Sequence, residues 1–196
     1  LDSGSAMGKG NGPLLISRKP YTLEDIPRLS VAIPGEYTTA HLLLQIAASP
    51  PKEKRFMIFS DIEKAVLTGI VDAGVIIHEN RFTYKEKGLM KIADLGEYWE
   101  KLTGSPIPLG GIIAKKSLGY GQINKLNRIM FRSVEFSMKY PELAMPFVRN
   151  HAQEMDEAVI QQHIGLYVND FTLRMGSIGK ASITRLFDIA TMKGII

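Results

Sequence analysis

The residue best suited to proton transfer in this chain is a histidine at the end of a predicted strand. Residues 71–77 (Val-Asp-Ala-Gly-Val-Ile-Ile) form an apolar run that predicts a buried strand, and His78 and Glu79 follow it directly. Imidazole can accept a proton near neutral pH, which makes His78 a candidate general base. An isolated histidine often has a purely structural role, and the residues alone leave that alternative open. The other histidines fall in helical patterns and are expected to be structural: His41, His151 and His163.

A second candidate site is the start of a predicted helix. Residues 29–33 predict a buried strand, a Pro-Gly pair stops it, and residues 40–48 form an apolar run typical of a helix. Thr38 or Thr39 is the expected N-cap. Backbone N–H groups at a helix N-terminus also bind anions. Capping and ligand binding are compatible, because one threonine can cap the helix while the other faces a ligand.

A glycine-rich segment near the start resembles a phosphate-binding loop only superficially. Residues 8–13 read Gly-Lys-Gly-Asn-Gly-Pro, but these glycines precede a predicted strand at residues 14–17 instead of following one. Pro13 also removes one backbone N–H. We therefore expect a tight turn into the strand and no nucleotide site.

The remaining polar motifs predict no metal site and no nucleophile triad. No two histidines have metal-ligand spacing on one helix, and no Ser–His–Asp order is recognisable. Asn169 follows a predicted helix over residues 159–168. It either ends that helix or places a polar group in a cleft, and the sequence does not separate the two.

The elements that must position these residues alternate between strand and helix. Residues 29–77 predict strand–helix–strand–helix–strand, which favours a parallel sheet in an α/β layer architecture. Ligands of such sheets bind beyond the carboxyl ends of the strands, where His78 and the Pro34-Gly35 turn are expected. Residues 80–110 look irregular, a strand is predicted at 112–115, and the chain after residue 120 is predicted to be helical.

Composition excludes several classes of protein. The 196 residues are 45% hydrophobic and 22% charged, which favours a globular fold over a disordered one. A net charge of +4 with mixed signs gives little support for nucleic-acid binding. With no cysteine, disulfides and thiolate metal sites are excluded, and a reducing compartment is consistent. No run reaches the about 18 apolar residues of a membrane helix, and no signal peptide is recognisable at Leu1.

Taken together, the motifs resemble the 1,4-dihydroxy-6-naphthoate synthases of the futalosine route to menaquinone. The resemblance covers nearly the whole chain, and the set of motifs is specific although each alone is not. The matching segments are residues 8–13 (GKGNGP), 31–40 (VAIPGEYTTA), 72–79 (DAGVIIHE), 81–83 (RFT), 94–99 (DLGEYW), 106–110 (PIPLG) and 167–169 (YVN).

The resemblance implies an α/β, two-lobed fold like the type II periplasmic binding proteins. Lobe one would hold residues 1–19 and 110–196, and lobe two residues 20–109. The substrate, cyclic dehypoxanthinyl futalosine, would lie between the lobes. His78 would be the proton acceptor, and Thr39 and Ala40 would contact the substrate, which carries a carboxylate.

The resemblance further implies a cytoplasmic enzyme with no metal or redox cofactor and with neither nucleic acid nor membrane as a partner. A homodimer is compatible with it. Family members also carry a segment before the glycine-rich region, which forms the first strands of lobe one and contributes a Lys-x-Ser substrate contact. That segment is absent here, so we expect a fragment whose lobe one lacks its N-terminal strands.

Two other functions fit the same fold. A solute-binding protein of a transporter shares the two lobes but needs no catalytic base. Chorismate dehydratase, the sister enzyme of the same route, has a similar fold, although the Thr-Thr-Ala and Ile-His-Glu motifs favour the synthase. A regulator's effector domain has less support, because no helix-turn-helix region precedes the fold in this chain.

Overall fold

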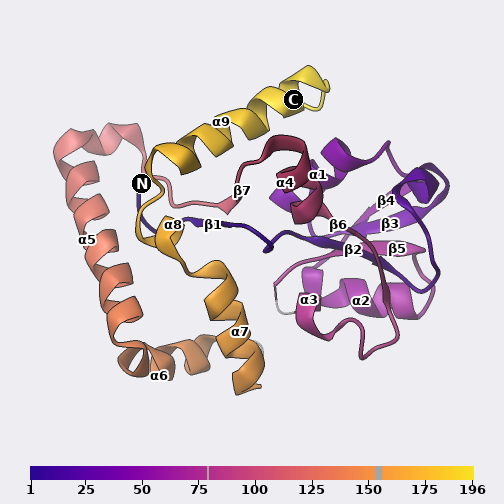
Figure 1. The fold of residues 1–196 in the computed structure, drawn as a ribbon, viewed down its shortest axis with the longest axis horizontal. Helices are drawn as coiled ribbons and strands as arrows, with labels where there is room; N and C mark the ends of the chain where they lie inside the picture. Colours follow the sequence, from indigo (N-terminus) through magenta and orange to yellow (C-terminus); the bar gives the residue numbers. More distant parts are fainter. Residues whose placement is uncertain (79, 153–155) are drawn as a thin grey trace. The chain divides into compact units, whose positions relative to one another are not determined.

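The chain divides into two compact units. The computed structural model describes residues 1–78, 80–152 and 156–196, so Glu79 of the His-Glu pair lies outside the described residues. Unit one comprises residues 1–8 and 108–183, and unit two comprises residues 9–107 and 184–196 (Figure 1). Each unit is considered by itself below.

Unit two is built on a five-stranded sheet in the order β4-β3-β5-β2-β6. β3 pairs in parallel with β4 and β5, as predicted, but β2 runs antiparallel to both β5 and β6. The expectation of a parallel sheet is therefore corrected to a mixed sheet, because a strand from earlier in the chain lies between β5 and β6. The strands are β2 (Leu14–Ser17), β3 (Ser30–Ile33), β4 (Glu53–Phe56), β5 (Ala73–Ile76) and β6 (Met90–Asp94).

Helices cover both faces of this sheet. Figure 1 shows α1 and α4 on one face and α2 and α3 on the other. Side chains alternate between the faces, so Leu15, Val31 and Val75 on one face and Ile16, Ala32 and Ile76 on the other are all fully buried. The helices of unit two are the 3-10 turn η1 (Leu23–Arg28), α1 (Thr39–Ala47), α2 (Phe59–Leu67), α3 (Asn80–Thr83), α4 (Leu95–Thr103) and the end of α9 (Gly176–Met192).

One glycine sets the distance between the sheet and α2. A Cβ atom added to Gly74 in β5 would lie 2.5 Å from the Ile62 side chain and 2.9 Å from that of Val66. The absence of a side chain at residue 74 therefore lets α2 pack directly on β5. This contact fixes the strand that leads to His78.

Two segments outside residues 20–109 also belong to unit two. Residues 14–17, which the resemblance assigns to lobe one, form β2 and supply hydrogen bonds to two strands of unit two. Residues 184–196 also belong to unit two, where Arg185 donates a 2.6 Å hydrogen bond to the carbonyl of Thr103. Local patterning does not reveal such pairings between segments far apart in the sequence.

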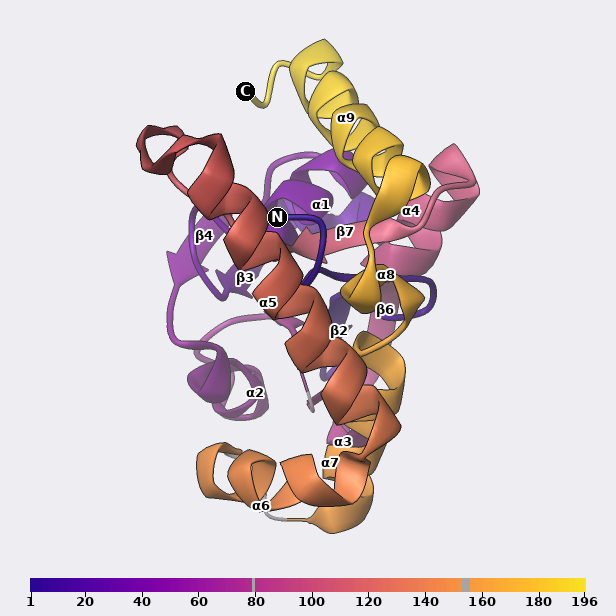
Figure 2. The same ribbon diagram turned by 90° about the vertical axis from the view of Figure 1, so that its left-hand side faces the viewer.

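Unit one is mainly helical, as predicted for the second half of the chain. The strand predicted at residues 112–115 is wrong: the strand is β7 (Ile107–Gly110), which pairs with β1 (Ala6–Gly8). In Figure 2, α5 is one long helix with α6 at its end. The helices are η2 (Lys116–Leu118), α5 (Gly119–Lys139), α6 (Pro141–His151), α7 (Glu157–Tyr167), α8 (Asp170–Leu173) and the start of α9. None of the described helices has the length and apolar character needed to span a bilayer.

A serine–aspartate clamp joins β3 and β5 at their amino ends. The Asp72 carboxylate accepts hydrogen bonds from the Ser30 hydroxyl at 2.7 Å and the Ser30 N–H at 2.9 Å. The Ser30 hydroxyl, followed by the Ser30 N–H, lowers the pKa of Asp72 from its ordinary value. The clamp therefore stabilises the charged form of Asp72.

Asp72→Asn is expected to reduce the free energy of unfolding by about 0.5–1 kcal/mol at neutral pH, since the carboxylate is largely exposed. Because folding lowers this pKa, the stabilisation is present above the ordinary aspartate pKa of about 3.9 and is lost as pH falls through the folded value. Urea unfolding of both proteins at several pH values measures the difference. Asp188→Asn, at an exposed position of α9, is the control. A difference that grows as pH falls would contradict this account.

Candidate active site

Four segments of unit two meet at one edge of the five-stranded sheet. β3 and β5 are parallel, and β2 runs antiparallel to β5 with Leu14 opposite Ile76. β6 pairs with β2 so that Asp94 also lies opposite Leu14. The chain before Leu14 and the chain after Ile33, Ile76 and Asp94 therefore lie at the same edge. We call this end of the sheet, at which the parallel strands β3 and β5 terminate, the carboxyl edge. Its described residues are 10–13, 34–41, 77–78, 80–81 and 94–97.

His78 occupies an unusual backbone conformation at this edge. It follows the strand, as predicted, although β5 ends at Ile76 and His78 lies two residues beyond that end; the His78 side chain is exposed. Its φ of 57° makes it the one non-glycine residue with positive φ in the described part of the chain. Such a conformation costs about 1–3 kcal/mol and is frequent at functional sites. The imidazole also meets the Phe59 ring edge-on, with centroids 5.1 Å apart.

The second candidate site lies at the start of α1. Thr38 is the N-cap: its hydroxyl accepts from the His41 N–H at 3.2 Å and donates to the Gly35 carbonyl at 2.8 Å. Of the two threonines, Thr38 therefore caps the helix. Thr39 is the first helical residue and half-buried, and Ala40 follows it in a buried position. The first N–H groups of a helix have no acceptor within the helix, and both residues are in that turn.

His41 is a core residue of the same helix. Its side chain is buried, and its Nδ1 lies 2.7 Å from the carbonyl oxygen of Glu36. The ring meets Phe56 edge-on at 5.3 Å. The buried position fits the structural role expected from the sequence, and the His41 Nε2 atom has no hydrogen-bond partner among the described residues.

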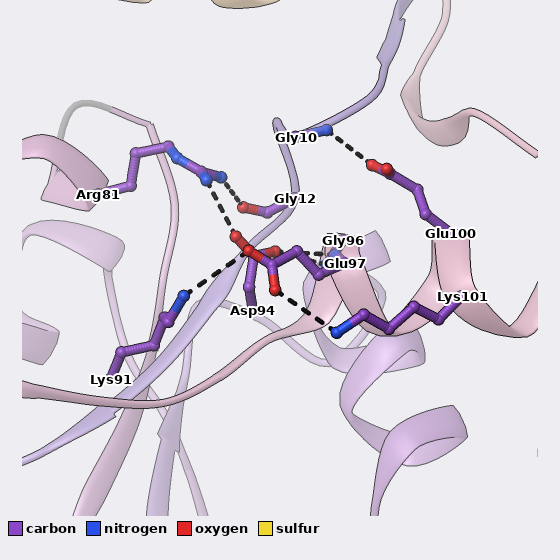
Figure 3. Close-up of polar contacts among 9 residues, drawn as sticks. All are labelled: Gly10, Gly12, Arg81, Lys91, Asp94, Gly96, Glu97, Glu100 and Lys101. Atoms are coloured by element: carbon purple, nitrogen blue, oxygen red, sulfur yellow. Dashed lines mark hydrogen bonds and ion pairs between the residues drawn. The ribbon is translucent and has the colours of Figure 1, made fainter.

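The N-terminus of α4 is capped by the carboxylate of Asp94. Asp94 is the N-cap and accepts hydrogen bonds from the N–H groups of Gly96 at 2.9 Å and Glu97 at 3.1 Å. The other carboxylate oxygen of Asp94 forms an ion pair with Arg81 at 3.1 Å. The Asp94 side chain is 4% exposed and the Arg81 side chain 12%. Arg81 also donates to the Gly12 carbonyl (Figure 3). Arg81 thus ties together three segments of the carboxyl edge.

The glycine-rich segment contacts α4 through two of its glycines, Gly10 and Gly12. Gly10 has a φ of 70°, and its N–H donates a 2.6 Å hydrogen bond to the Glu100 carboxylate of α4. A Cβ atom on Gly12 would lie 2.3 Å from the Cα of Gly96, so only glycine permits this backbone contact. The expected turn into a strand is confirmed, since β2 begins at Leu14.

The side-chain amide of Asn11, between these two glycines, has no hydrogen-bond partner in the described part of the chain. The side chain is completely buried, and neither its Oδ1 nor its Nδ2 atom has a partner among the described residues. More than about 90% of buried polar groups are hydrogen-bonded, and each unpaired group costs about 1–3 kcal/mol. The sequence analysis did not single out Asn11, because an asparagine in a glycine-rich turn has an ordinary local explanation.

The side-chain amide of Asn169, unlike that of Asn11, has hydrogen-bond partners among the described residues. It caps α8, accepting from the Phe171 N–H at 2.9 Å, and its Nδ2 donates to the Met7 carbonyl at 2.8 Å. The sequence prediction that Asn169 ends the preceding helix is wrong: α7 ends at Tyr167 with Val168 as its C-cap, and Asn169 caps the following helix.

Comparison with known proteins gives consistent matches over the whole chain. A family model described as menaquinone biosynthesis matches residues 1–192. A curated relative from Thermus thermophilus, named 1,4-dihydroxy-6-naphthoate synthase, is 44% identical over 100% of this chain and 71% of its own length.

Solved structures give the same fold. A crystal structure of an Archaeoglobus fulgidus protein aligns with a TM-score of 0.93 and 32% identity, covering 100% of this chain and 73% of that one. The ligand-binding component of an ABC-type import system from Staphylococcus aureus aligns with a TM-score of 0.62 and 12% identity, covering 99% and 69% of the two chains. The α/β fold is therefore of the type found in periplasmic binding proteins, as predicted.

Proposed function

The chain belongs to the menaquinone-biosynthesis family of enzymes, and from this we propose that it is a 1,4-dihydroxy-6-naphthoate synthase that cleaves cyclic dehypoxanthinyl futalosine. One observation carries the proposal within the structure. His78 and the first turn of α1 extend from the ends of two neighbouring parallel strands, β5 and β3. A base and an anion-binding backbone at one edge of a sheet match a reaction that removes a proton from a carboxylate-bearing substrate.

In this reaction His78 acts as the general base. The imidazole accepts a proton bound to carbon, and the electron pair left behind opens the spiro ring system. The sugar-derived piece leaves, and the remaining ring becomes the aromatic dihydroxynaphthoate. The exposure of His78 and its edge-on contact with Phe59 support this role, since the ring is both accessible and oriented.

Thr39 and Ala40 bind the substrate carboxylate. They occupy the first turn of α1, where the helix dipole and the backbone N–H groups stabilise a negative charge. Thr38 takes the capping role, so the Thr39 hydroxyl is not needed as the cap. The start of α4 is not a second anion site, because Asp94 already occupies it.

The test is an assay of the complete protein with cyclic dehypoxanthinyl futalosine, followed by chromatography and mass spectrometry. We expect 1,4-dihydroxy-6-naphthoate to form at a rate proportional to enzyme concentration. Chorismate, supplied in a parallel reaction, is expected to remain unchanged. Conversion of chorismate in place of the futalosine derivative would identify the sister dehydratase instead. Tight binding of the substrate with no product would support a solute-binding protein.

A further inference from the structure

We propose that Asn11 binds hydroxyl groups of the sugar-derived part of the substrate through both polar atoms of its amide. This inference rests on the proposed function and adds a substrate-binding residue to it. It starts from the observation that the Asn11 side chain is completely buried while its Oδ1 and Nδ2 atoms have no partner among the described residues. A ligand that supplies those partners explains why a polar residue is kept there.

Asn11 is placed at the carboxyl edge together with the proposed base. It lies three residues before Leu14, whose partner in β5 is Ile76, and His78 lies two residues beyond Ile76. Adjacent strands are about 4.8 Å apart, so segments that leave neighbouring strands at one edge stay within reach of one small molecule. Asn11 therefore lies at the same end of the sheet as His78.

The backbone on each side of Asn11 is fixed before any ligand binds. Gly10 is held by Glu100, and the Gly12 carbonyl accepts a hydrogen bond from Arg81. The close approach of Gly12 to Gly96 prevents the turn from shifting towards α4. Such preorganisation is what a specific binding residue requires, because little conformational freedom is lost on binding.

The chemistry of the amide selects the kind of group it binds. An asparagine side chain offers one acceptor oxygen and two N–H donors, so satisfying both atoms requires a ligand that donates and accepts. A carboxylate only accepts, and the first turn of α1 already suits it. Hydroxyl groups do both: one can donate to Oδ1 while its neighbour accepts from Nδ2. Sugar hydroxyls therefore match Asn11 better than the carboxylate does.

The decisive variant is Asn11→Leu in the complete protein, because leucine has a similar size and no polar atoms. We expect kcat/KM to fall about 100-fold, mostly through a higher KM, since a site built to bind hydroxyls discriminates strongly when these bonds are lost. The melting temperature is expected to stay the same or to rise, because an unpaired buried amide is removed. The control is Asn124→Leu, the same change at an exposed position of α5, with unchanged kinetics.

A substrate analogue lacking one sugar hydroxyl tests the contact directly, and also covers the case in which Asn11→Leu does not fold. The wild type should bind this analogue at least about 10-fold more weakly than the substrate. Asn11→Asp, which keeps an acceptor but loses both donors, should show an intermediate loss. Unchanged KM in a folded Asn11→Leu protein, or equal affinity of the wild type for substrate and analogue, overturns the proposal. An inactive wild type would instead refute the proposed function.

Discussion

Replacing His78 by asparagine is expected to lower kcat by about 1,000-fold while leaving substrate affinity nearly unchanged. General base catalysis contributes about 10²- to 10⁴-fold to rate, and an amide cannot accept the proton. Asparagine is the appropriate replacement because His78 has a φ of 57°, and asparagine tolerates left-handed backbone better than most residues. The fold of the loop should therefore survive, and the loss can be assigned to the imidazole.

Three measurements separate this role from a structural one. Substrate affinity of His78→Asn is measured by isothermal titration, and its melting temperature by calorimetry; neither should differ much from wild type. His78→Ala is expected to lose turnover to the same extent. His151→Asn changes an exposed histidine of α6 and should leave kcat unchanged. Turnover of folded His78→Asn within a few-fold of wild type would refute the base assignment.

Local patterns were sufficient to predict the residues at the strand ends. The apolar run before His78 predicts β5, and the threonines after the Pro-Gly turn predict the start of α1. Both features depend on neighbouring residues only. Their presence at one edge also follows, because consecutive βαβ units place successive strand ends together.

Long-range pairing could not be predicted in the same way. β6 (Met-Lys-Ile-Ala-Asp) is a partly exposed edge strand. Of the described strands it pairs only with β2, which comes from the start of the chain. Its sequence has little alternation or β-branched character, so residues 80–110 look irregular. Residues 14–17 are predicted as a strand, but the antiparallel place of β2 depends on its pairing with β5 and β6, which local patterns do not reveal.

The buried groups of the site depend on that pairing. Arg81 and Asp94 form an ion pair because β6 ends with Asp94 at the carboxyl edge. No pattern of hydrophobic and polar residues in the sequence predicts this contact. That the Asn11 amide has no hydrogen-bond partner among the described residues is a property of its surroundings and not of the tripeptide Gly-Asn-Gly. Residues of this kind become visible only when hydrogen bonds are assigned in three dimensions.

Arg81→Met is expected to be the most destabilising change at the carboxyl edge. The methionine fills much of the space of arginine but leaves the Asp94 carboxylate, 4% exposed, without its positive partner. Breaking a buried pair on one side typically costs about 3–5 kcal/mol. The Gly12 carbonyl loses its donor as well, so the turn that holds Asn11 becomes looser and KM should rise. Urea unfolding and steady-state kinetics measure the two effects.

A second substitution shows whether the uncompensated charge is the cause. In Arg81→Met/Asp94→Asn the charge is gone, yet the amide oxygen can still accept from the Gly96 N–H as the cap of α4. The double variant should therefore be more stable than Arg81→Met alone, although KM stays raised because Gly12 still lacks its donor. The control is Lys101→Met, which removes a cation that is 82% exposed and lies 4.0 Å from Glu97, and should cost less than about 0.5 kcal/mol. Equal losses for Arg81→Met and Lys101→Met would mean that the Arg81–Asp94 pair does not hold the carboxyl edge together.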